Sequence, residues 1–134
     1  MVAGNAPEPN ALTTSKHHAQ IMKGVLDMCL LARIAEEPSY GYELVTTLND
    51  GGLPVAGEGS IYPVLKRLKQ QGLIEGYLVD SPSGPARKYY RATPEGDLVL
   101  ADWKTDWTNV ANGVNAMLAT RNKPTSKGKK GTAR

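Results

Sequence analysis

The sequence predicts a mainly α-helical protein with one small β-hairpin, in the order helix, helix, helix, hairpin, long helix. Apolar residues recur at helical spacing over four segments, and two β-prone runs flank a segment rich in Gly and Pro. A length of 134 residues with a hydrophobic share of 40% suits a single globular domain. We expect a disordered segment at 1–18, a compact domain at 19–93, a long helix at 94–120 and a disordered basic tail at 121–134.

The first two helices are predicted from apolar periodicity and from the residues that end it. From Ala19 to Glu37 apolar residues are so frequent that little of the helix is left for solvent, so we expect it to pack between other elements. Pro38 ends this helix. Ser39 is expected to cap the second helix, which covers Tyr40 to Leu48.

The third helix is predicted from Glu58 to Gln71, with Gly72 as its C-terminal stop. Pro63 lies inside this segment, and proline in a helix interior costs about 3 kcal/mol. The conflict disappears if the helix begins between Gly57 and Ser60, because the amides of the first turn have no acceptor within the helix.

A hairpin and a long helix complete the predicted fold. The strands Ile74–Val79 and Ala86–Ala92 are joined by Asp80–Pro85, where clustered Gly and Pro predict a loose tip. Thr93 then caps the last helix, and Pro94 takes its first position. This helix carries an apolar seam at spacings of three and four residues, made of Val99, Trp103, Trp107, Val110, Val114 and Met117.

Charge is distributed unevenly along the chain. Residues 121–134 hold six basic and no acidic side chains, whereas residues 1–120 hold ten basic and thirteen acidic ones. Within that acidic body, the window from Lys66 to Arg91 has a net charge of +4. Three helices followed by a hairpin form a winged helix-turn-helix, and the basic window covers its third helix (the reader helix) and its hairpin (the wing). The sequence therefore predicts double-stranded DNA as the partner.

The reader helix is expected to turn Ile61, Leu65 and Leu68 toward the core. Its other side then offers hydroxyls and cations to phosphate, and the wing offers cations just past its tip. The simpler alternative is a solvated amphipathic helix whose charges serve solubility alone. The candidate DNA contacts are Ser60, Tyr62, Pro63, Lys66 and Arg67 on the reader helix, and Arg87 and Lys88 on the wing.

Four motifs follow one another along the chain, namely Tyr40–Leu44, Gly59–Leu68, Gly72–Ile74 and Gly84–Gly96. Their order and spacing resemble those of the PadR family of bacterial transcriptional regulators, and the resemblance extends from about Lys23 to Leu118. The resemblance implies a winged helix-turn-helix followed by a single dimerising helix. It also implies a homodimer that represses transcription until a small molecule releases it. Two positions depart from the family pattern. A residue with a capping side chain is common where Gly57 stands, and a bulkier aliphatic residue is common where Ala92 stands.

The resemblance also implies roles for single residues. Tyr42 would lie near the DNA backbone on the second helix, beside the reader and wing residues named above. Because few of these side chains form bidentate pairs with bases, we expect phosphate contacts and DNA shape to matter heavily. A dimer of this kind binds a pseudo-palindromic operator.

Trp103 and Trp107 are the candidate effector site, because a spacing of four residues places both on one face of the last helix. Some members of the family bind flat aromatic ligands between tryptophans at the dimer interface, so a planar aromatic effector is expected, or alternatively a nucleotide-like one. Both tryptophans could instead form dimer core, and Trp103 could pack under the wing.

Other functional classes find little support in the sequence. There is no phosphate-binding Gly-rich loop, nucleophile–base pair or metal-ligand cluster, so we expect neither an enzyme, nor a cofactor, nor a metal. Cys29 is expected to be an inert core thiol, and His17–His18 lack a third ligand. No apolar run spans a bilayer and no signal peptide precedes the fold, so the cytoplasm is expected. The rival reading is a winged-helix protein-interaction module without specific DNA binding. The basic tail is either solvated or a non-specific DNA anchor.

Overall fold

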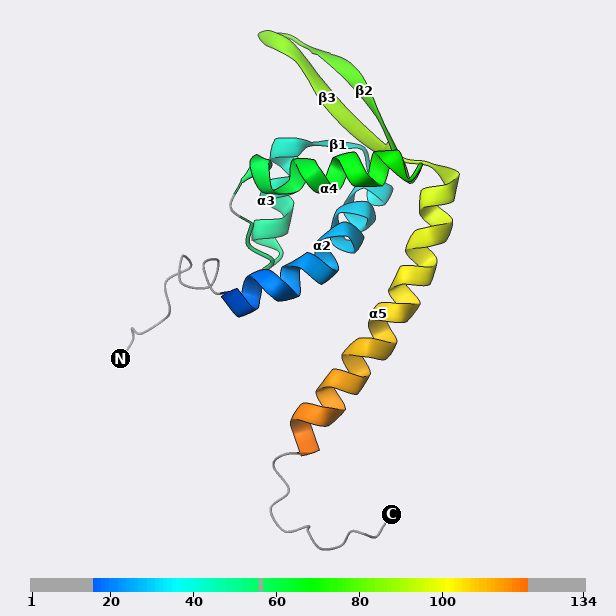
Figure 1. Ribbon diagram of the computed structural model, residues 1–134. Coiled ribbons are helices and arrows are strands. Elements are labelled where there is room, and N and C mark those ends of the chain that lie inside the picture. Colours follow the sequence, from blue (N-terminus) through cyan, green and yellow to red (C-terminus); the bar gives the residue numbers. More distant parts are fainter. Residues whose placement is uncertain (1–15, 56, 121–134) are drawn as a thin grey trace, which may run out of the picture. The chain divides into compact units, whose positions relative to one another are not determined.

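The computed structural model describes residues 16–55 and 57–120, and these form helices and a small antiparallel sheet, as predicted (Figure 1). Residues 1–15 and 121–134, where disorder is predicted, lie outside the described residues. The chain divides into two units, one ending at Leu100 and the other beginning at Ala101. In chain order the described elements are α2 (Lys16–Glu36), β1 (Ser39–Tyr40), α3 (Gly41–Asp50), α4 (Glu58–Gln70), β2 (Ile74–Ser81), β3 (Gly84–Ala92) and α5 (Pro94–Thr120).

Helix α2 is the centre of the core, which confirms the prediction that it packs between other elements. It contacts α3, α4 and strand β3. Burying one aliphatic side chain contributes about 1.5–3 kcal/mol to stability, so the few fully buried side chains of this core supply most of the stabilisation. Helix α2 begins three residues earlier than predicted, because Lys16–His18 continue its first turn. The most deeply buried side chains are Leu30, Leu31, Ile34, Leu44, Ile61, Leu65 and Leu68.

The cap predicted at Ser39 is wrong. The Ser39 hydroxyl donates to the carbonyl oxygen of Glu37 at 3.1 Å, and Tyr40 occupies the N-cap position of α3. Ser39 and Tyr40 are extended because they form strand β1, paired with Tyr90 and Tyr89 of β3. This pairing joins residues about fifty positions apart, so a local capping pattern could not reveal it. The sheet order is β1–β3–β2.

Helix α4 begins at Glu58, inside the expected range, but Pro63 is its sixth residue and therefore lies beyond the first turn. The expectation that it falls among amides without acceptors is therefore wrong. Its ring faces the carbonyl of Gly59, four residues earlier, and both residues are exposed. Water can therefore satisfy the carbonyl that the missing amide leaves unbonded. Gly57 provides no side-chain cap, in keeping with its departure from the family pattern.

The wing is tighter than predicted. Strand β2 continues to Ser81 and β3 starts at Gly84, so Ser81 pairs with Gly84 across a two-residue turn. The loose tip predicted over Asp80–Pro85 is wrong. The irregular composition instead marks a break in the pairing register between Val79 and Ser81.

The joint between the wing and α5 follows the prediction at Thr93. Its hydroxyl oxygen accepts a hydrogen bond from Gly96 N–H at 3.0 Å, as an N-cap does, and donates to the carbonyl of Gly72 at 2.7 Å. The backbone N–H of Thr93 donates to the carbonyl of Leu73 at 3.0 Å. Gly96 is buried with its Cα against that Leu73 carbonyl, where a Cβ has no room. Three bonds and one close contact thus fix the first turn of α5.

Candidate nucleic-acid interface

Helix α4 presents the surface predicted for the reader helix. It buries Ile61, Val64, Leu65 and Leu68, and it contacts both α2 and α3. The five side chains predicted to face outward are all exposed, namely Ser60, Tyr62, Pro63, Lys66 and Arg67.

The two hydroxyls of this surface are already bonded within the protein. The Ser60 hydroxyl donates to the carbonyl of Gly57 at 2.6 Å. The Tyr62 hydroxyl donates to Glu58 Oε1 at 2.6 Å, and this bond, with smaller contributions from burial and nearby charge, raises the pKa of Tyr62 to about 12. The Tyr62 hydroxyl therefore stays protonated at any physiological pH, with its proton turned to Glu58 rather than to solvent.

Arg67 is held by a carboxylate that the sequence analysis missed. Its Nε and Nη2 donate to Asp27 Oδ2 and Oδ1 at 3.0 and 2.8 Å, which is a bidentate pair between α4 and α2. The hydrogen bonds to Asp27 raise the pKa of Arg67 further, so its charge is permanent. Asp27 neutralises much of that charge toward DNA. Forty residues separate the two partners, and no short-range pattern connects them.

Lys66 and Lys69 are the reader cations without such a partner. Both are exposed, and neither has an ion pair or hydrogen bond within the residues that the structure describes. Lys66 therefore remains the reader side chain best suited to phosphate, with Lys69 close to it on the same helix.

The two wing cations lie on opposite faces of the hairpin, since adjacent strand residues alternate. The Lys88 stem lies over Gly76, on the face that carries the buried ring of Tyr90. The Arg87 guanidinium lies over the Tyr40 ring, with 4.7 Å between Cζ and the ring centroid. Hence Arg87 and Lys88 do not present their charges in the same direction.

The outer face of the sheet is a ladder of tyrosines with an arginine at each end. Tyr40 and Tyr89 lie 5.2 Å apart between ring centroids, and Tyr89 and Tyr77 lie 6.1 Å apart. At the end opposite Arg87, the Arg91 guanidinium lies 4.6 Å from the Tyr77 ring and bonds Glu75 at 2.8 Å. We call this set of Arg87, Tyr40, Tyr89, Tyr77 and Arg91 the tyrosine ladder. Four of these residues lie on the two strands that the sequence predicts for the hairpin. Tyr40 joins them only because β1 pairs with β3, and the sequence did not predict β1.

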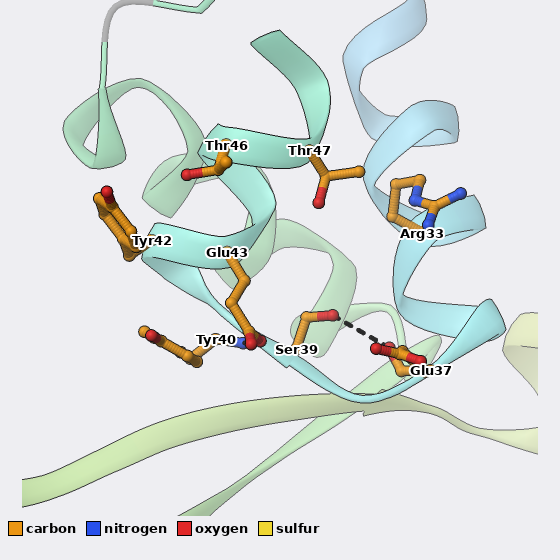
Figure 2. Close-up of a pocket in the computed structure, with 8 residues that line it drawn as sticks. All are labelled: Arg33, Glu37, Ser39, Tyr40, Tyr42, Glu43, Thr46 and Thr47. Carbon is orange, nitrogen blue, oxygen red and sulfur yellow. Dashed lines mark hydrogen bonds between the residues drawn. The ribbon is translucent and has the colours of Figure 1, made fainter. Parts of the chain in front are cut away.

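A pocket of 230 Å³ opens beside β1 and the outward side of α3 (Figure 2). Figure 2 shows Tyr40 and Tyr42 toward one end of it and Arg33 at the other. Arg33 already pairs with Glu36 at 2.7 Å, and two further carboxylates line the wall. Carboxylates therefore outnumber cations here, which does not suit a phosphate. Tyr42, the contact implied for the DNA backbone, is exposed at the rim. The lining residues are Arg33, Glu37, Ser39, Tyr40, Tyr42, Glu43, Thr46 and Thr47.

The second unit is the remainder of α5, and it exposes the predicted seam. The exposed fraction is 45% for Trp107 and 72% for Met117, and the fractions for Val110 and Val114 lie between these two values. Trp103 is half-buried. Elsewhere, Cys29 is half-buried rather than fully buried, and burial raises the pKa of its thiol, which lowers its reactivity.

Three helices, a short strand and a hairpin, with cations on the third helix and the hairpin, define a winged helix-turn-helix DNA-binding protein. Residues 30–102 match the family described as the transcriptional regulator PadR-like family. The chain belongs to this family of DNA-binding transcriptional regulators, which are not enzymes.

Individual relatives agree with this assignment. The transcriptional regulator Rv3488 of Mycobacterium tuberculosis is 33% identical over 85 residues, which cover 62% of this chain and 76% of the relative. The crystal structure of a PadR-like regulator from Bacillus cereus superposes with a TM-score of 0.67 at 47% identity, covering 74% of this chain and 96% of the other. A PadR family regulator from Eggerthella lenta gives 0.67 at 37% identity, with 75% and 87% covered. Between Lys16 and Thr120, Ala56 aside, no helix is long and apolar enough to cross a membrane.

Proposed function

We propose that this regulator is a homodimeric repressor that binds a pseudo-palindromic operator and is released by a small molecule bound between the protomers. The exposed apolar seam of α5 carries the proposal. A contiguous row of large apolar side chains on one helix face is unfavourable in water, and a second copy of the same helix is its natural cover. The row consists of Trp107, Val110, Val114, Met117 and Leu118, all exposed.

In this dimer the two α4 helices enter successive major grooves, with half-sites about one helical turn apart or a small multiple of that. Lys66 and Arg87 supply unpaired charge to phosphates, while Tyr42, Ser60, Tyr62, Pro63 and Arg67 line the approach, as does Lys88 on the other wing face. Affinity then falls steeply with salt, since each phosphate contact releases counterions. The operator lies on chromosomal DNA, so the protein acts in the cytoplasm.

The effector is a flat aromatic or nucleotide-like molecule that stacks on Trp107, with Trp103 one turn away on the same helix face. Helix α5 begins two residues after β3 ends, so a rotation of α5 moves the root of the wing. Because operator spacing is fixed by DNA geometry, a small shift misaligns one reader helix. A coupling of about 1–3 kcal/mol between the two sites suffices for a large change in occupancy.

The test uses the fact that the chain has only two tryptophans, both on α5. A panel of flat aromatic acids and nucleotides is titrated while tryptophan fluorescence and DNA binding are followed together. We expect a compound that quenches the fluorescence to release DNA, and Trp107→Ala to abolish the release while the protein still binds DNA as a dimer. A Trp107→Ala protein that responds normally would place the effector elsewhere and leave the tryptophans as dimer core.

A further inference from the structure

We propose that Tyr40 is a positioning residue for DNA binding, which holds the wing cation Arg87 at a fixed place relative to the reader helix α4. The inference rests on the phosphate contact proposed above for Arg87. It concerns a residue of the two-residue strand β1, which belongs neither to the reader helix nor to the wing hairpin.

Arg87 is held in place without losing its charge. Its Cζ lies 4.7 Å from the centroid of the Tyr40 ring, and its Nη1 donates to the Tyr40 hydroxyl at 3.3 Å. Both groups of Tyr40 that contact Arg87, the ring and the hydroxyl, are neutral. A cation over a tyrosine ring is attracted by the ring quadrupole but keeps its full positive charge for other partners. A phosphate can therefore bind the guanidinium while Tyr40 continues to hold it.

Arg91, at the other end of the tyrosine ladder, provides the contrast. Its guanidinium lies over Tyr77 at nearly the same distance, 4.6 Å, but it also bonds Glu75 at 2.8 Å. That carboxylate neutralises Arg91. Two arginines thus have the same aromatic support, and only Arg87 keeps its charge available.

Tyr40 is itself fixed by the sheet. Its backbone pairs with Tyr89 of β3, and its ring packs at 5.2 Å and a tilt of 52° on the Tyr89 ring. Tyr89 in turn stacks on Tyr77. The ring that supports Arg87 is therefore part of a row of three, and it does not depend on a single flexible side chain.

The residue after Tyr40 connects the same point to the reader helix. Gly41 is buried, and a Cβ built on it would lie 2.9 Å from the Tyr62 hydroxyl oxygen and 3.0 Å from Glu58 Oε1. The first turns of α4 therefore pack directly on the Tyr40–Gly41 backbone. Consecutive residues contact the wing cation on one side and the reader helix on the other, so their geometry sets the distance between the two DNA-binding elements.

This arrangement favours binding through entropy. A free arginine side chain loses conformational entropy about several rotatable bonds when it binds a phosphate, and that loss reduces the affinity gained. Arg87 is already ordered by Tyr40 in the free protein. Loss of the Tyr40 ring is therefore expected to weaken DNA binding although Tyr40 itself makes no contact with DNA.

The experiment measures binding by fluorescence anisotropy over a series of salt concentrations. The probe is a duplex from the region upstream of the protein's own gene, with a mixed-sequence duplex of equal length beside it. We expect Arg87→Ala to weaken binding several-fold and to lower the salt slope by about 1.8, since each of the two protomers loses one phosphate contact worth about 0.9. Tyr40→Leu is expected to weaken binding comparably, and the double variant to be no weaker than Arg87→Ala alone. Tyr40→Phe, which keeps the ring, restores most of the affinity.

Arg91→Ala is the matched control, because it removes the wing arginine that Glu75 already neutralises, and it should lower the salt slope by much less than Arg87→Ala does. If Arg87→Ala leaves affinity and slope at parental values, the proposed wing contact itself fails. If Arg87→Ala weakens binding and Tyr40→Leu does not, the wing contact stands and the positioning role is overturned. Full additivity in the double variant also overturns it, since Tyr40 then acts independently of Arg87.

Thermal unfolding followed by circular dichroism checks that the variants are folded. Should Tyr40→Leu prove unfolded, Arg87→Lys tests the same contact from the exposed side. Lysine keeps the charge and lacks the planar guanidinium that covers the ring, so we expect an unchanged salt slope with several-fold weaker binding. Parental affinity in that variant overturns the proposal.

Discussion

At the scale of single residues, two of the proposed DNA contacts on the reader helix donate to the protein's own carboxylates. Tyr62 donates to Glu58, and Arg67 makes a bidentate pair with Asp27. These acids lower the positive potential of a surface that would otherwise attract any polyanion. Exposure of the reader residues could be predicted from helical spacing, whereas Asp27 could not, because its pairing depends on how α2 crosses α4.

Asp27→Asn is therefore expected to tighten DNA binding. The substitution removes a negative charge and frees the Arg67 guanidinium, so affinity should rise several-fold at low salt for specific and mixed-sequence duplexes alike. Fluorescence anisotropy over a salt series measures the change. Glu36→Gln, which releases Arg33 on α2, is the control and should alter affinity less. Equal or weaker binding by Asp27→Asn would show that the pair serves to orient Arg67.

The Tyr62–Glu58 bond has a pH signature. Because the pKa of Tyr62 is raised to about 12 from the ordinary value of 10, the bond contributes stability that is fully present below about pH 10 and is lost as pH rises through about 12. An ultraviolet absorbance titration of the parent minus Tyr62→Phe should show one tyrosine ionising near pH 12. Glu58→Gln should return that ionisation toward pH 10. If the curve of the parent minus Tyr62→Phe is instead centred at pH 10, the Tyr62–Glu58 bond does not form in solution.

At the scale of elements, periodicity predicted α2, α3 and α4 well because each buries one face, and it predicted α5 because the apolar residues of its seam keep helical spacing. The elements that depend on long-range pairing were missed or misjudged. Strand β1 has two residues, too few for a pattern, and exists because β3 offers its edge. The wing turn is tight although Pro82 and Gly84 suggested a loose tip, since cross-strand pairing continues to Ser81. The start of α5 was predicted correctly at Thr93, where a local capping pattern and the tertiary contacts agree.

Gly96 tests the joint between the wing and α5. A Cβ at this position meets the Leu73 carbonyl, which is backbone and cannot move aside cheaply. Gly96→Ala should therefore destabilise the protein by about 1–3 kcal/mol despite the better helix propensity of alanine. Gly24→Ala in α2 is the matched control, since a Cβ there meets nothing within 4 Å, and it should stabilise by about 0.5–1 kcal/mol. Urea unfolding of both variants measures the difference, and two changes of the same sign would contradict the close contact at Gly96.

At the scale of the whole molecule, the seam of α5 is the largest row of exposed apolar side chains that the proposed dimer would bury. Val114 lies within it and is half exposed, so Val114→Glu should disrupt the proposed dimer, because burying a carboxylate among apolar side chains is costly. Light scattering should then give a mass near 14.4 kDa rather than twice that value. Asn112→Glu is the control, since about 100° per residue places Asn112 on the opposite side of α5. A monomeric parent protein would refute the dimer itself.

The register of the small sheet has a kinetic consequence. Strand β1 reaches only Tyr89 and Tyr90, so within the described part of the chain the wing is a two-stranded ribbon from Lys88 to Gly84. Isolated ribbons of this kind open readily, whereas a strand paired on both sides does not. Amide hydrogens of the outer ribbon should exchange with deuterium faster than those of Tyr89 and Tyr90. The contact between Arg87 and Tyr40 then limits how often the ribbon opens. When DNA binds, the outer amides should slow most, so the wing tip would report occupancy of the operator on the timescale of hydrogen exchange.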